Sequence, residues 1–204
     1  LYDEPFIYKN ITFVGLPFEQ IEGEKLIAKL NSKKKYLREE KTNILLFHGE
    51  LLDSTFSRHN FGEEGELRYM PVKLSYFKDI NISYILAGHF HTNFDVRKFS
   101  GGKYFIYPGS PVSVTRKEIG QRSANLLEVG KAPKQYMLNT HHYEEVQVVL
   151  DPFEEIDPID IIKEKLEKVH SKATITLIVK GYIDGQKINK TEMQTIDFNL
   201  VGQF

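Results

Sequence analysis

The chain has 204 residues, of which 41% are hydrophobic, so it is long enough for a globular core and is neither disordered nor fibrous. The formal net charge of -1 argues against binding nucleic acid through overall charge alone, and the lack of cysteine excludes disulfides and thiolate metal sites. No apolar run approaches the ~20 residues of a membrane-spanning helix. We therefore expect a soluble, cytoplasmic protein with no membrane attachment.

The first residues predict strands and a helix. Residues 5–16, PFIYKNITFVGL, favour two short strands around a turn at Lys9 and Asn10, because β-branched and aromatic residues flank a turn-prone asparagine. Apolar spacing over 19–37 predicts a helix. The lysines at 33–35 are expected to form its solvated end, with a nucleic-acid patch as the alternative. Residues 43–48, NILLFH, then predict a buried strand that ends at His48.

The middle of the chain indicates an α/β arrangement. A mixed segment over 49–70 predicts a long surface loop, and a short helix is expected around 73–78. ISYILA predicts a second buried strand that ends at Gly88 and His89, which completes a strand-helix-strand order. A hairpin turned at 100–102 and two further strands before residue 140 predict antiparallel structure.

A rise in polarity near Thr140 predicts a boundary between residues 1–140 and 141–204. His141 and His142 are expected to lie exposed in the linker. Beyond it, a strand, a helix and a strand follow over about 143–184, with Asp157 as the helix N-cap. The second part is therefore expected to be a compact α+β appendage.

Three histidines are candidates for a metal site. His89 and His91 lie two residues apart, and in extended chain such side chains project from one face about 6–7 Å apart. His48 ends the other buried strand, and the carboxyl ends of neighbouring parallel strands lie together. The three imidazoles would supply part of a metal centre, because a two-metal site needs carboxylate ligands as well. The alternative is a His-x-His pair on a half-exposed strand that binds no metal.

These residues carry a family resemblance. His48 after NILLF, then GHFH at 88–91, then IYPGSP at 106–111 resemble the calcineurin-like metallophosphoesterases and, more narrowly, the SbcD-type nucleases of DNA double-strand-break repair. The resemblance implies a site for two Mn²⁺ ions, with His48 and His89 as ligands of one ion and His91 as a ligand of the other. It also implies an α/β to α+β fold, with the C-terminal part of a layered β-sandwich metallophosphoesterase domain before a small cap domain.

The chain departs from this family in its early motifs. Asp-x-His, Gly-Asp-x-x-Asp and Gly-Asn-His-Asp, which carry the remaining ligands and the catalytic histidine, do not occur in the sequence. Together with a first residue, Leu1, that is not methionine, this leads us to expect the C-terminal portion of such a nuclease. We expect this portion to contain no catalytic residue and to be inactive alone.

The resemblance also implies a function for the intact protein. It would be a manganese-dependent phosphodiesterase or exonuclease that acts on DNA ends, pairs with an SbcC-type ATPase and forms a homodimer. Arg58 and His59, in the loop after the first ligand, are candidates for contacting phosphate, and an exposed loop without contacts is the alternative. Two other functions stay open: a general phosphoesterase acting on nucleotides or phosphoproteins, and a non-catalytic binding or assembly module with structural histidines.

Overall fold

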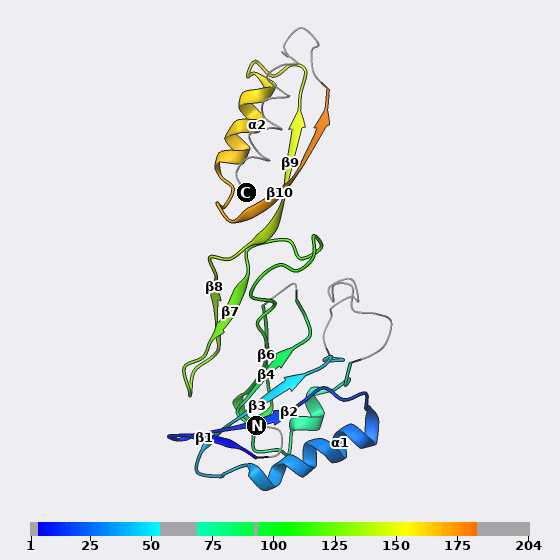
Figure 1. Cartoon of the computed structure of the whole chain (residues 1–204), viewed down its shortest axis with the longest axis vertical. Coiled ribbons are helices and arrows are strands. Elements are labelled where there is room, and N and C mark those ends of the chain that lie inside the picture. Colours follow the sequence, from blue (N-terminus) through cyan, green and yellow to red (C-terminus); the bar gives the residue numbers. More distant parts are fainter. Residues whose placement is uncertain (1–3, 54–68, 92–93, 183–204) are drawn as a thin grey trace. The chain divides into compact units, whose positions relative to one another are not determined.

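The computed structural model describes residues 4–53, 69–91 and 94–182, and its fold is mixed α/β with a multi-stranded sheet and few helices (Figure 1). The chain separates between Thr140 and His141 into two compact units. Within the described ranges, no helix is both long and apolar enough to cross a membrane.

The first unit is organised around a six-stranded sheet with the order β1-β2-β3-β4-β6-β5. Its strands are β1 (Phe6–Tyr8), β2 (Ile11–Leu16), β3 (Thr42–His48), β4 (Tyr84–Gly88), β5 (Asp95–Phe99) and β6 (Lys103–Tyr107). The central strands β2, β3, β4 and β6 are parallel, and β1 and β5 pair antiparallel at the two edges.

Both predicted hairpins, β1–β2 and β5–β6, are confirmed. The antiparallel pairings predicted after the second buried strand are present as β5–β6 and as β7 (Ser123–Leu126) with β8 (Lys134–Met137), and β6 in addition pairs parallel with β4, which the sequence did not indicate. The sequence of β6, KYFIY, explains this pairing, since a short apolar run suits a parallel strand buried on both faces.

The central strands have a hydrophobic cluster on each face. Because side chains alternate across a strand, Leu45 and Phe47 of β3 point to one face, and Ile44 and Leu46 to the other. On the first face, Leu26 and Leu30 of helix α1 (Gly23–Ser32) join the larger cluster. The second face has a smaller cluster, to which Leu127 adds. The strands are thus held from both sides.

The helix predicted over 19–37 is divided. It consists of α1 followed by the 3-10 helix η1 (Lys33–Tyr36), and the short helix expected near 73–78 is the 3-10 helix η3 (Leu74–Phe77). The prediction that the lysine run is solvated is wrong for Lys33, which is buried with its ammonium 5.9 Å from the centre of the Tyr36 ring. The long alkyl chain of lysine allows such burial, since only the terminal ammonium group needs a polar or aromatic neighbour.

After the sheet, the short helix η4 (Ser100–Gly102) connects β5 to β6, and β7 (Ser123–Leu126) pairs antiparallel with β8 (Lys134–Met137). The turn between β7 and β8 is tied to β4: the Tyr84 hydroxyl donates to the Lys131 carbonyl and accepts from the Gly130 N–H.

The second unit contains a parallel pair of strands, β9 (His142–Leu150) and β10 (Ala173–Gly181), and helix α2 (Pro158–Glu167). The predicted strand-helix-strand order is confirmed. So is the predicted N-cap, because the Asp157 carboxylate accepts a hydrogen bond of 2.8 Å from the Ile159 N–H.

One prediction for this unit is wrong. His142 is fully buried rather than exposed, and its Nε2 lies 2.8 Å from a carboxylate oxygen of Glu144. The strand begins at His142 itself, so alternation places both side chains on the same face of β9. The polar residues of this segment therefore belong to the strand, where a buried histidine pairs with a partly exposed carboxylate.

Candidate functional site

The carboxyl ends of β3 and β4 bring two of the predicted ligands together. The strands pair in parallel with His48 opposite Gly88, so His89 follows directly beside His48. The two imidazole centres lie 5.7 Å apart, with an angle of 69° between the ring planes. His89 is buried, whereas His48 is half-buried. The two rings are near enough to offer nitrogen atoms to one small ligand.

Gly88 gives the His48 ring its space. A Cβ atom at Gly88 would lie 3.0 Å from the Nδ1 atom of His48, which is tighter than ordinary van der Waals contact. The residue opposite His48 therefore has to be small for the imidazole to keep this position.

His89 has an unusual backbone conformation. Its φ angle is 121°, a region that side-chain-bearing residues rarely adopt. β4 has already ended at Gly88, so residues 89–91 do not continue the strand as the spacing argument assumed. The imidazole is held by neighbouring rings: Tyr69 stacks on it at 4.7 Å, and Phe90 lies edge-on at 5.5 Å. Such outliers occur where the surroundings determine the backbone, often at functional sites.

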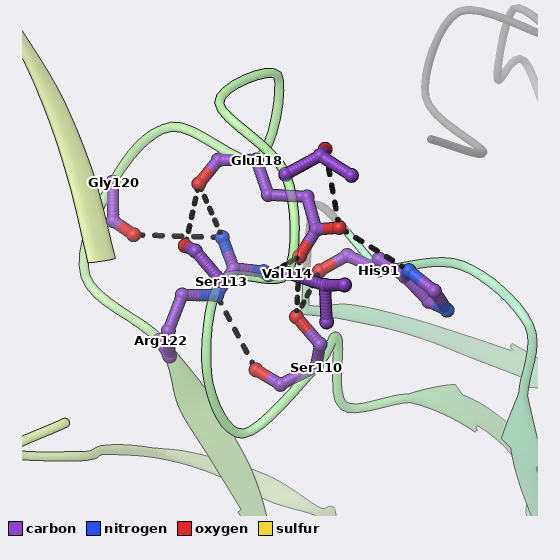
Figure 2. A network of polar contacts seen from close by, with 8 residues as sticks. His91, Ser110, Ser113, Val114, Glu118, Gly120 and Arg122 are labelled. Carbon is purple, nitrogen blue, oxygen red and sulfur yellow. Dashed lines mark hydrogen bonds and ion pairs between the residues drawn. The ribbon is translucent and has the colours of Figure 1, made fainter. Parts of the chain in front are cut away.

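His91 has a partner that the sequence did not indicate. Its Nδ1 lies 3.3 Å from a carboxylate oxygen of Glu118, whose side chain is fully buried (Figure 2). The same carboxylate accepts hydrogen bonds from the Ser110 hydroxyl at 2.9 Å and the Val114 N–H at 3.1 Å. Burial acts to raise the pKa of Glu118, but these hydrogen bonds and His91 outweigh it and hold the pKa below its usual value. Glu118 is therefore a buried carboxylate anion.

Arg122 completes this network from the other side. Its guanidinium is buried and donates to the backbone carbonyls of Ser110, Glu118, Gly120 and His91. Burial lowers the pKa of Arg122, and the nearby Glu118 charge opposes that shift. A buried charge needs hydrogen bonds or an opposite charge, and Arg122 has both. The loop from residue 110 to residue 122 is thus fastened to the backbone of His91.

The sequence did not indicate Glu118 or Arg122, and it indicated Ser110 only as part of the IYPGSP motif. The Ser110 N–H donates to the His91 carbonyl at 2.9 Å, so Ser110 also fixes the candidate ligand. Neither Glu118 nor Arg122 lies in a periodic sequence pattern. The one feature of the sequence that could have indicated them is that they closely follow the Pro-Gly-Ser-Pro turn of this motif in the chain.

Not all of the predicted residues fall in the described part of the chain. Arg58 and His59 lie outside the described residues. Asp53, a nearby acid, accepts a hydrogen bond from the Leu74 N–H at the start of η3. Its carboxylate therefore has a local structural role.

The donor set fits only part of a metal centre. Within residues 4–53, 69–91 and 94–182, no group of three or more histidine and carboxylate side chains lies close enough to hold an ion. The adjacent imidazoles of His48 and His89 are nitrogen ligands that first-row divalent metals accept. A complete centre would need ligands besides these.

Comparison of the chain with models of protein families finds no match, and comparison with curated proteins finds none at a significant level.

Proposed function

We propose that this chain is the C-terminal, metal-binding portion of a manganese-dependent phosphodiesterase that acts on DNA ends. The observation that carries the proposal is the meeting of His48 and His89 at the ends of two adjacent parallel strands, with ring centres 5.7 Å apart. Ligand sites of open α/β sheets collect at such strand ends. The fold would be that of the metallophosphoesterases, with the first unit as part of the layered domain.

The residues of the chain would hold two Mn²⁺ ions together with ligands from upstream. His48 and His89 would bind one ion, and His91 would bind the other. When bound, a metal pair of this kind neutralises phosphate charge and lowers the pKa of a bound water. Gly88 leaves room for the His48 ring, and Tyr69 covers one face of the His89 ring. These contacts would keep both ligands in place.

The remaining parts of the proposal concern partners. The second unit, with β9, α2 and β10, would be a cap that grips DNA, and the intact protein would form a homodimer with an SbcC-type ATPase bound to it. The modest net charge of -1 supports DNA binding through a local surface rather than through total charge.

The experiment that tests the proposal is calorimetric titration of Mn²⁺ into this chain and into the same protein extended upstream. We expect tight binding only in the extended protein, and its loss in His48→Ala, His89→Ala and His91→Ala. His141→Ala is the matched control, because His141 is exposed and lies in the second unit.

Two results would contradict the proposal: no binding in either protein, or binding that all three variants retain. Hydrolysis assays then separate the substrates. A DNA-end nuclease degrades duplex DNA with Mn²⁺, whereas a general phosphoesterase would cleave nucleotides or phosphopeptides and leave DNA intact.

A further inference from the structure

We propose that Glu118 is a positioning residue for His91: it accepts a hydrogen bond from Nδ1 and thereby places the lone pair of the neutral ring on Nε2, the atom through which His91 would bind a divalent cation. The inference rests on the proposed function for the identity of the cation. The tautomer that it assigns to His91 rests on the hydrogen bonds of the loop at 110–122 (Figure 2).

The direction of the Glu118–His91 contact follows from the other groups around the carboxylate. Oε2 accepts from the Val114 N–H at 3.1 Å and from the Ser110 hydroxyl at 2.9 Å. Oε1 accepts from the Thr115 hydroxyl at 3.4 Å and faces Nδ1 of His91 at 3.3 Å. An ionised carboxylate only accepts hydrogen bonds, so Nδ1 has to be the donor. A neutral His91 then has its proton on Nδ1 and a lone pair on Nε2.

Both ends of this contact are fixed. The Glu118 carbonyl accepts from the Ser113 hydroxyl at 2.7 Å and from Arg122, and the His91 carbonyl accepts from the Ser110 N–H and from Arg122. Ring and backbone of His91 are therefore held by one loop. The Glu118 side chain is fully buried, whereas the His91 side chain is 28% exposed.

This arrangement matches a common way of tuning metal-binding histidines. A ligating histidine usually donates its second ring N–H to a carboxylate or carbonyl, which fixes the tautomer and orients the ring. The alternative is a purely structural role, in which Glu118 only accepts hydrogen bonds from donors of its own loop. The two roles differ in whether Glu118 determines which ring nitrogen of His91 carries the proton.

Glu118→Gln separates them by reversing one hydrogen bond. The Val114 N–H can only donate, so the amide oxygen of the glutamine has to take the place of Oε2. The amide NH₂ then takes the place of Oε1 and donates to Nδ1 of His91. The proton of the neutral ring moves to Nε2, and the lone pair that would bind a cation is lost. Thr115→Val is the matched control, because it removes a second donor to Oε1 without reversing the contact.

The test is nitrogen-15 NMR of histidine-labelled chain in mildly alkaline solution, with the His91 signals assigned through His91→Gln. We expect the Nδ1–H tautomer in the wild-type chain and in Thr115→Val, and the Nε2–H tautomer in Glu118→Gln. The wild-type spectrum alone overturns the inference if it shows Nε2–H, so the test survives a poorly folded variant. An unchanged tautomer in folded Glu118→Gln overturns it as well.

Mn²⁺ titration of the upstream-extended protein distinguishes this inference from the proposed function. A tautomer switch together with affinity about 10–100-fold lower in Glu118→Gln supports both. A tautomer switch without Mn²⁺ binding in any form supports the positioning of His91 and overturns the proposed function. Tight binding that Glu118→Gln leaves unchanged overturns the positioning role alone.

Discussion

The two units use parallel strands in different ways. In the first unit, β3 and β4 are apolar runs with a hydrophobic cluster on each face. In the second unit, β9 and β10 pair over nine residues, and among the residues that the structure describes there, a cluster that includes Ile162 of α2 covers one face. On the other face Val149 is 74% exposed. Burial on both faces fixes the strand ends from which His48 and His89 extend, whereas burial on one face leaves a broad surface in contact with solvent.

The largest expected effect is the loss of a ring from the two-sided core. Phe105 is fully buried, and we expect Phe105→Ala to destabilise the first unit by about 3–5 kcal/mol through lost burial and a cavity. Val149→Ala on the open face should change stability by less than about 0.5 kcal/mol. Urea unfolding followed by circular dichroism measures both. A large loss of unfolding free energy in Val149→Ala would show that this face is covered in solution and would contradict the contrast between the two units.

A smaller effect is expected at the strand ends. In Gly88→Ala the added methyl group presses on the His48 ring, which has to turn away, and overpacking of this kind typically costs about 1–3 kcal/mol. Mn²⁺ affinity of the upstream-extended protein should fall as well. Gly130→Ala is a control for adding a methyl group at a glycine, because a Cβ atom there would have no heavy atom within 4 Å. The φ angle of 86° at Gly130 adds backbone strain to this variant, so the comparison concerns Mn²⁺ affinity rather than stability. Unchanged Mn²⁺ affinity in Gly88→Ala would contradict the role given to this space.

The helices that cover the two units offer a finer contrast. The Asp157 side chain caps α2, whereas Glu22 precedes α1 without a side-chain cap hydrogen bond. We expect Asp157→Ala to cost about 1 kcal/mol and Glu22→Ala close to nothing, again by urea unfolding. Equal costs would mean that α2 is held by packing rather than by its cap.

The smallest expected effect is on acid stability in metal-free protein. The folded pKa of Glu118 is lowered, so its contribution is fully present above the usual glutamate value of 4.5 and is lost as the pH falls below it. Glu118→Gln should remove this part of the pH dependence. A hydrogen bond from Lys168 lowers the pKa of Glu164, but this pair is exposed, so salt should abolish its effect and leave that of Glu118. Salt sensitivity at Glu118 would argue against its burial.

Much of the fold could be predicted, because it follows from runs and periods in the sequence. The apolar runs that end at His48 and Gly88 indicate buried strands, and the apolar spacing after Asp157 indicates α2. The adjacency of His48 and His89 then followed from the rule that parallel strands end together. These predictions depend on contacts among many similar residues, so small errors at the boundaries do not change them.

The polar network could not be predicted, because each of its bonds depends on the path of a loop. Glutamate and arginine are usually exposed, and nothing in the pattern around Glu118 and Arg122 marks them as buried. The same limit explains His142 and Lys33, which polarity placed in solvent. For such residues, burial is decided by one or two partners rather than by a repeating pattern.

The bent backbone of His89 has a consequence for affinity. A residue held at a φ of 121° stores strain, typically about 1–3 kcal/mol, which the rest of the fold has already offset. A ligand that needs this conformation meets it preorganised and loses less free energy to ordering when it binds. Since 1.4 kcal/mol is about a tenfold change in affinity, the conformation alone is worth a factor of about 5–150 in binding.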